Sequence, residues 1–128
     1  MADSAEHGFC PRFHAAVELI GGRWTGAIIR VLLQGRTRYA VLRGGIPQIS
    51  DRMLSARLKE LEAELIVRRI VTPDTPVRVE YELTKKGRAL HDAVDAIAAW
   101  AEAWIPAVDA KASPAPASVT KSRRRRSA

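Results

Sequence analysis

The chain has 128 residues, of which 47% are hydrophobic, so it is long enough for one domain with a buried core. Basic residues outnumber acidic ones by 21 to 14, and arginines interrupt the longest apolar run, so the sequence contains no candidate membrane span. A single cysteine, Cys10, cannot form an internal disulfide, and the first eight residues lack the apolar segment of a secretory signal, so we expect a cytoplasmic protein.

Three helices are predicted in the first third of the chain. The first covers residues 11–20, with a proline in its first turn and apolar side chains at helical spacing. The second covers residues 24–32 and is expected to end before Gly35. The third covers residues 38–43 and is expected to end at Gly44.

A fourth helix is predicted from Ser50, which is a preferred N-cap residue. Leu54, Leu58 and Leu61 recur at intervals of four and three, which gives one narrow buried stripe. The other faces carry small and basic side chains. Such a face suits insertion into the major groove of DNA, where a bulky or acidic face would be excluded or repelled. These side chains are Arg52, Ser55, Ala56 and Lys59, with Arg57 at the margin of the stripe.

Two strands and a last helix follow. Residues 66–72 are rich in β-branched side chains and residues 78–84 alternate apolar and charged side chains, which predicts a two-stranded β-hairpin with a five-residue tip. The last helix is predicted from a cap at Thr84 to Ile105, before Pro106. Its apolar residues form a short heptad-like seam, which predicts a homodimer. The seam consists of Leu90, Val94, Ile97, Ala101 and Trp104, with Trp100 beside it.

The chain divides into three parts. Residues 1–9 are expected to be a flexible N-terminus, residues 10–106 the folded domain, and residues 107–128 a disordered basic tail, because the tail is rich in Ala, Pro and Ser. Charge is segregated within the domain, since residues 23–88 hold 14 Lys or Arg against 7 Asp or Glu. We therefore expect a basic face for a polyanion.

The order of these elements predicts an α+β, mainly α fold, a winged helix-turn-helix that binds double-stranded DNA. Arg52 is the best candidate base reader, because a guanidinium can bind guanine bidentately. Arg69 and Arg78 could bind DNA or pair with glutamates across the hairpin, and a solvated surface is the alternative for every basic residue. The predicted DNA contacts are Arg38, Ser50, Arg52, Ser55, Ala56, Arg57, Lys59, Arg69, Arg78 and Lys85.

The sequence resembles the HxlR family of bacterial winged helix-turn-helix regulators over about residues 10–105. The blocks that carry the resemblance are Cys10-Pro11, Leu19-Ile20-Gly21-Gly22-Arg23-Trp24, Arg38-Tyr39, Ile46-Pro47, Ile49-Ser50, Met53-Leu54, Leu58-Lys59-Glu60-Leu61-Glu62, Val79-Glu80-Tyr81, Leu83-Thr84 and Gly87. The resemblance implies a homodimer built from the N- and C-terminal helices, which adds Phe13 and Val17 to the dimerisation residues. It also implies operator binding by the helix that begins near Ser50, with the wing in an adjacent groove.

One position departs from the family pattern. Where the family usually has glycine after the recognition helix, this chain has Leu65. Glycine accepts a left-handed backbone at little cost, whereas leucine is strained there by about 1 kcal/mol or more. We therefore expect this helix to end in a different way.

Two alternatives are open for Cys10. A lone cysteine is most often buried, here under the first helix. Its position just before a helix N-terminus instead favours a reactive thiolate, and several members of the HxlR family use a cysteine near the N-terminus as a redox or electrophile sensor. The pair of His7 and Cys10 has too few ligands to bind a metal, and His14 and His91 have no partner at ligand spacing, so we expect no metal and no cofactor.

The sequence therefore predicts a transcriptional regulator without enzymatic activity. We expect a homodimer on a pseudo-palindromic operator, acting as a repressor and responding to oxidation or to a small-molecule effector. The alternative is a non-specific, nucleoid-associated architectural protein that binds DNA through the tail arginines, Arg123–Arg126. A module that binds only protein is disfavoured by the basic middle segment.

Overall fold

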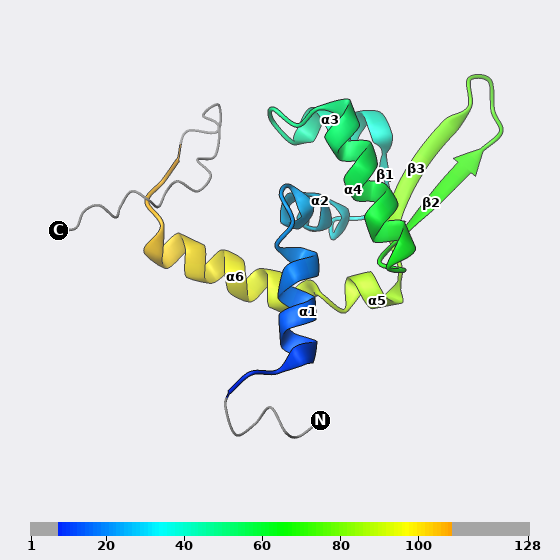
Figure 1. Cartoon of the computed structure of the whole chain (residues 1–128). Coiled ribbons are helices and arrows are strands. Elements are labelled where there is room, and N and C mark those ends of the chain that lie inside the picture. The colour runs from blue at the N-terminus through cyan, green and yellow to red at the C-terminus, as the bar shows by residue number, and fades with distance from the viewer. Residues whose placement is uncertain (1–7, 109–128) are drawn as a thin grey trace.

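The computed structural model describes residues 8–108, so the predicted basic tail from residue 109 onward and most of the predicted flexible N-terminus lie outside the described residues. This part of the chain forms short helices and a small sheet (Figure 1). They are α1 (Pro11–Ile20), α2 (Thr25–Leu32), β1 (Thr37–Arg38), α3 (Tyr39–Gly45), α4 (Asp51–Ala63), β2 (Val67–Thr72), β3 (Arg78–Leu83), α5 (Lys85–Arg88) and α6 (His91–Trp104).

The first four helices lie close to their predicted positions. α1 has the predicted bounds and begins with Pro11. Ser50 caps α4 as predicted, because its Oγ accepts the backbone N–H of Met53 at 3.0 Å and so satisfies a donor at the helix start. α3 extends further than predicted, since Gly44 and Gly45 form its last turn instead of following it.

The sheet has three strands in the order β1-β3-β2, so the predicted two-stranded hairpin was incomplete. β2 and β3 form that hairpin, with Val67 opposite Leu83. β1 adds a strand on the other side of β3 and places Arg38 opposite Glu80. The sequence pattern could not reveal β1, because the strand has two residues and its partners lie far along the chain.

The hydrophobic core lies between α2, α4 and the sheet. The predicted stripe of α4 is buried, with Leu54, Leu58 and Leu61 each at most 1% exposed. They pack with buried residues of the other elements, which include Ile28, Ile29, Leu42, Ile66, Tyr81 and Leu83. α3, α4 and the hairpin lie on one side of α2, and α1 and α6 lie on the other (Figure 1).

The prediction of one long last helix is wrong, because this segment is divided into α5 and α6. Thr84 caps α5, where its Oγ1 accepts the backbone N–H of Gly87 at 3.1 Å. Leu90 precedes α6 and packs against the core, and Val94 is buried in the core one turn later. The first turn of α6 is thereby fixed to the domain, and the rest of α6 projects away from it (Figure 1).

α4 ends in a left-handed turn at Leu65. This residue has a φ of 62°, a conformation that suits glycine, and its side chain is 67% exposed. The following N–H, that of Ile66, donates to the Leu61 carbonyl at 2.9 Å, as in a glycine-terminated helix. The expectation of a different helix end is therefore wrong, because Leu65 adopts the left-handed backbone conformation itself.

Replacing Leu65 with glycine is expected to stabilise the domain by about 1 kcal/mol, because glycine adopts this φ without strain. Urea unfolding followed by tryptophan fluorescence measures the change. Leu65→Ala is the matched control, since alanine removes the exposed side chain but keeps the strain. If the glycine variant is no more stable than the alanine variant, backbone strain at this position is not the cause.

Candidate nucleic-acid interface

One side of α4 is open to solvent and carries the predicted groove-facing side chains. Arg52, Ser55, Ala56 and Lys59 are all exposed, on the opposite side of the helix from the buried leucines. Within residues 8–108, Arg52 and Lys59 form no ion pair, so both cations are available to an anionic ligand. The Ser50 oxygen accepts from Met53, which leaves the Ser50 hydroxyl proton for a phosphate oxygen.

Arg57 does not belong to this surface. Its Nε donates to the Arg23 carbonyl at 2.8 Å, and its Nη1 donates to Glu60 Oε2 at 3.0 Å. The guanidinium therefore ties α4 to the turn between α1 and α2. The structure gives Arg57 a structural role in place of the predicted DNA contact, because its position at the margin of the leucine stripe turns it toward the protein.

A hydrogen-bond network joins α3 to the start of α4. Arg43 Nε donates to Asp51 Oδ1 at 2.8 Å, and the Tyr39 hydroxyl donates to the same oxygen at 3.2 Å. The Tyr39 hydroxyl also lies 3.3 Å from Ser55 Oγ. These contacts fix the two helices of the helix-turn-helix relative to each other. Sequence reasoning missed Arg43, and no local spacing could have found it, since its partner lies eight residues away on another helix.

The outer face of the sheet carries an ion-pair cluster of two arginines and two glutamates. Glu82 accepts from Arg68 Nε at 3.1 Å and from Arg36 Nε at 3.4 Å, and Arg36 also lies 3.7 Å from Glu80. The hydrogen bonds from Arg68, and then those from Arg36, hold the pKa of Glu82 below its ordinary value, against the opposing effect of burial. The two glutamates thus neutralise Arg36 and Arg68.

Arg69 lies on the other face of the sheet. It is paired with Tyr81, and residues opposite each other in an antiparallel pair share a face. Tyr81 is buried in the core, whereas Arg69 is exposed and forms no ion pair with any described residue. The predicted pairing of Arg69 with a glutamate across the hairpin is therefore not found, and its charge is available to a ligand.

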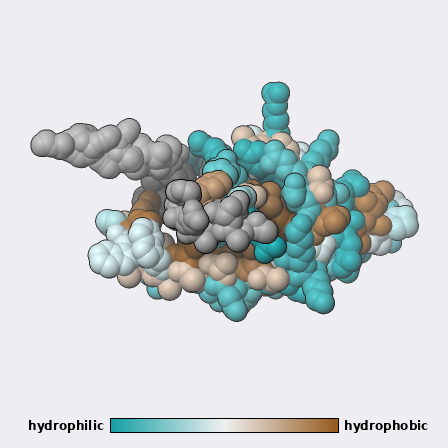
Figure 2. All heavy atoms as spheres, turned by 60° about the horizontal axis from the view of Figure 1, so that its bottom comes forward, coloured by the Kyte–Doolittle hydropathy of each residue, from teal (hydrophilic) through white to brown (hydrophobic). Residues whose placement is uncertain are grey.

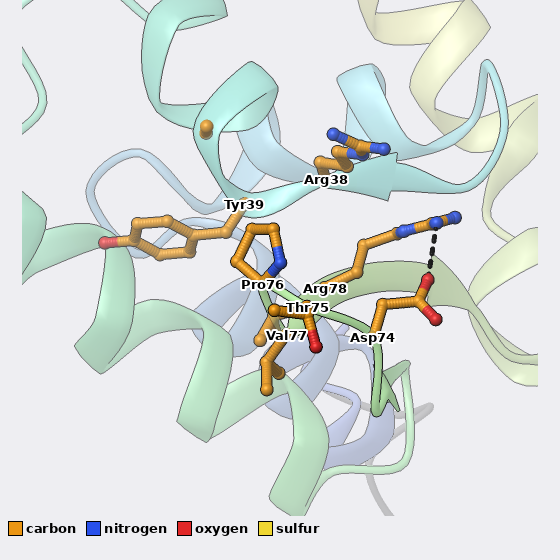
Figure 3. A pocket seen from close by; sticks show the side chains of 9 residues that line it. Arg38, Tyr39, Asp74, Thr75, Pro76, Val77 and Arg78 are labelled. Carbon is orange, nitrogen blue, oxygen red and sulfur yellow. Dashed lines mark hydrogen bonds and ion pairs between the residues drawn. The ribbon is translucent and has the colours of Figure 1, made fainter.

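A pocket of about 570 Å³ lies between the start of α3 and the tip of the hairpin. Figure 3 shows Arg38 and Arg78 extending along one side of it, with the Tyr39 ring on the other side. Arg78 Nη2 donates to Asp74 Oδ2 at 2.8 Å, so its partner is an aspartate of the tip and not a glutamate of β3. Arg38 is exposed and has no ion pair among residues 8–108.

The two lysines at the start of α5 differ. Lys86 Nζ donates to the Glu64 carbonyl at 2.7 Å, and thereby binds a carbonyl at the end of α4. The Lys85 side chain is exposed and has no partner in the described part of the chain. The side chain of Lys85, which is one of the predicted DNA contacts, is therefore available to a ligand.

Comparisons with known proteins agree with this geometry. A family model described as an HxlR-like helix-turn-helix matches residues 19–109. The chain belongs to this family. A relative is the uncharacterized HTH-type transcriptional regulator YvaP of Bacillus subtilis (strain 168), which is 48% identical over 96 residues, or 75% of this chain and 89% of that protein.

Two solved structures share the fold of this HxlR-like regulator. The reduced form of YodB from B. subtilis has a TM-score of 0.69 and 46% identity, over 79% of this chain and 99% of that one. The redox regulator HypR in its oxidized form has a TM-score of 0.71 and 37% identity, over 77% and 100%. YodB has also been solved in diamide-treated and quinone-bound forms. The relatives are thus transcriptional regulators, and some of them respond to redox conditions.

Cys10 of this HxlR-like chain is exposed, so the predicted burial under the first helix is wrong. It is the N-cap of α1, where its Sγ accepts the backbone N–H of Phe13 at 3.4 Å. The thiol is therefore open to oxidants and electrophiles. Among residues 8–108 the structure holds no group of three His, Cys, Asp or Glu arranged for a metal ion, and no helix long and apolar enough to span a membrane.

The predicted dimerisation residues of the HxlR-like chain fall into two groups. Leu90 and Val94 belong to the core of their own protomer, and Ala101 is half-buried. The large apolar side chains of the second group are exposed. Figure 2 brings forward the side of the molecule where α1 and α6 lie, and hydrophobic residues reach the surface there. They are Phe13 and Val17 of α1 and Ile97, Trp100 and Trp104 of α6.

Proposed function

We propose that this HxlR-like chain is a sequence-specific repressor that binds a pseudo-palindromic operator as a homodimer. The observation that carries the proposal is the exposed face of α4, where Arg52 and Lys59 have no partner in the described part of the chain and flank the small residues Ser55 and Ala56. Small side chains let the helix approach base edges, and free cations bind phosphates or guanine.

The surrounding cations extend this surface. We expect Arg38 and Arg78 beside the pocket, and the exposed Arg69 of the hairpin, to bind the DNA backbone next to the groove that α4 enters. A phosphate near the pocket competes with Asp74 for Arg78, which the free protein holds in an ion pair. Operator occupancy then blocks polymerase, so repression needs no further activity from the protein.

The homodimer is supported by the apolar surface of α1 and α6. Monomeric soluble proteins rarely expose several large apolar side chains together. A two-fold axis through this surface presents two copies of α4 to the same side of a duplex, with half-sites about one turn, or 34 Å, apart. The symmetry of the protein thereby sets the symmetry of its operator.

Replacing Arg52 with alanine is expected to remove base preference at one position of each half-site, at a cost of about 1–3 kcal/mol for the preferred base. Selection of bound sites from a random duplex library, followed by affinity measurements at fixed salt, checks this. Arg30→Ala is the control, because Arg30 is an exposed arginine of α2 beside α6. An equal loss for all sequences would show that Arg52 binds phosphate only.

The same selection separates the repressor from the architectural alternative. A chain truncated after residue 110 lacks the basic tail and is expected to select the same operator, with a smaller salt dependence. Collapse of all DNA binding in the truncated chain would favour a non-specific protein that relies on its tail. Absence of any selected sequence with the full chain would contradict the proposed function itself.

We also propose that oxidation of Cys10 weakens operator binding. The thiol is exposed at the start of α1, next to the apolar surface offered for dimerisation. Two protomers can form an intersubunit disulfide, with both thiol protons and two electrons passing to the oxidant. A small molecule that modifies the thiol would act at the same place.

Treatment with diamide is therefore expected to lower operator affinity about tenfold in the wild type and to leave Cys10→Ser unchanged. Fluorescence anisotropy with a labelled operator measures the affinity, and a non-reducing gel detects the disulfide. Equal loss of affinity in both proteins would remove Cys10 from the mechanism.

A further inference from the structure

The hydrogen bonds of Tyr39 determine where its proton goes. Its hydroxyl oxygen lies 3.2 Å from Asp51 Oδ1 and 3.4 Å from the backbone oxygen of Asp51. Its third neighbour is Ser55 Oγ, at 3.3 Å. A carbonyl oxygen and a carboxylate oxygen only accept hydrogen bonds. If Tyr39 gave its single proton to Ser55, its own oxygen would face the Asp51 oxygens with no proton between them, so we assign the Tyr39 proton to Asp51.

The direction of the bond between Tyr39 and Ser55 follows. A phenol oxygen that has given its proton to Asp51 can only accept from its third neighbour, so Ser55 is the donor. Arg43 Nε donates to the same carboxylate oxygen at 2.8 Å and holds Asp51 in place. Ser55 thus donates to Tyr39, and Tyr39 donates to Asp51, which also accepts from Arg43. The only hydroxyl proton of Ser55 is therefore used within the protein.

We infer that Ser55 reads a base edge as a hydrogen-bond acceptor, an inference that rests on the proposed function. Ser55 is exposed, and it shares its side of α4 with Arg52 and Lys59, three residues before and four after it. With its proton donated to Tyr39, the serine oxygen presents lone pairs to the groove. It acts as a specificity-determining residue through this fixed orientation.

The bases that fit an acceptor are defined by the major-groove pattern. Adenine N6 and cytosine N4 donate hydrogen bonds, whereas guanine O6 and thymine O4 accept them. An oxygen without a proton to give therefore favours adenine or cytosine on the strand that it contacts. It disfavours guanine and thymine, because two acceptors would face each other. An unoriented serine hydroxyl would make no such distinction, since it can donate or accept.

Selection from a duplex library with a randomised core tests this inference. The wild type is expected to prefer adenine or cytosine about fivefold at one position of each half-site, as expected for one neutral hydrogen bond. Ser55→Ala is expected to lose this preference at that position alone. Tyr39→Phe keeps the ring and removes the hydroxyl, so the freed Ser55 hydroxyl can also donate and the preference is expected to fall below about twofold.

Tyr81→Phe is the matched control, since it makes the same chemical change at a tyrosine whose hydroxyl has no partner among the described residues. This variant is expected to keep the fivefold preference. If Ser55→Ala leaves every position unchanged, Ser55 does not read a base. If Ser55→Ala abolishes the preference and Tyr39→Phe retains it, Tyr39 does not orient the serine. Either result overturns the inference while leaving the operator, and with it the proposed function, intact.

Discussion

Replacing Gly87 with alanine is expected to lower the free energy of unfolding by about 2–4 kcal/mol. Gly87 is buried in α5, and a Cβ there would lie 2.3 Å from the Ile66 carbonyl oxygen and 3.0 Å from Leu83 Cδ2. That oxygen accepts the Thr84 N–H at 2.9 Å, so it cannot retreat without breaking this bond. The Thr84 hydroxyl lies 3.2 Å from it but donates to the Leu65 carbonyl at 2.6 Å. Overpacking costs about 1–3 kcal/mol and each lost hydrogen bond about 1 kcal/mol.

Urea unfolding measures this loss, and Gly26→Ala is the control. Gly26 lies in α2, with nothing within 4 Å of the position where a Cβ would be added. Alanine is favoured over glycine in a helix, so this variant is expected to be more stable than the wild type by up to about 1 kcal/mol. If the Gly87→Ala protein is as stable as Gly26→Ala, the backbone where β2, β3 and α5 meet can shift to make room for the added Cβ, and the predicted clash is wrong.

Features with a local cause could be predicted from the sequence. Pro11 marks the start of α1, and Ser50 marks the start of α4 because a capping side chain acts within one turn of its own helix. The leucine stripe of α4 also follows from helical spacing alone, and it leaves Arg52, Ser55, Ala56 and Lys59 on the open side. The left-handed end of α4 at Leu65 was not predicted, because the leucine was expected to end the helix in a different way.

Features that depend on distant contacts could not be predicted. β1 exists only through its pairing with β3, and the break between α5 and α6 lies next to Leu90, which packs against the distant core. Long basic side chains are the clearest case in the site. The partner of Arg57 is a carbonyl 34 residues away, and no spacing in the sequence indicates that contact. Sequence reasoning therefore identified the exposed surface of α4 better than the roles of the arginines around it.

Replacing Trp100 with glutamate is expected to dissociate the proposed homodimer and, with it, high-affinity operator binding. Trp100 is 59% exposed on the projecting part of α6, and Ile97 and Trp104 lie on the same side of the helix. A buried interface tryptophan contributes about 2 kcal/mol or more. A symmetric interface contains it twice, so the dissociation constant should rise about a thousandfold.

Sedimentation of the purified protein measures the dimer, and Ala99→Glu is the control because it adds the same charge on a different side of α6, facing Arg30 across a cavity. The control is expected to remain dimeric and to bind its operator as the wild type does. A Trp100→Glu protein that stays dimeric would place the two-fold axis elsewhere on the molecule. A single copy of α4 can occupy only one half-site of the operator. A Trp100→Glu protein that is monomeric yet keeps full operator affinity would therefore contradict the proposal that high-affinity binding requires the homodimer.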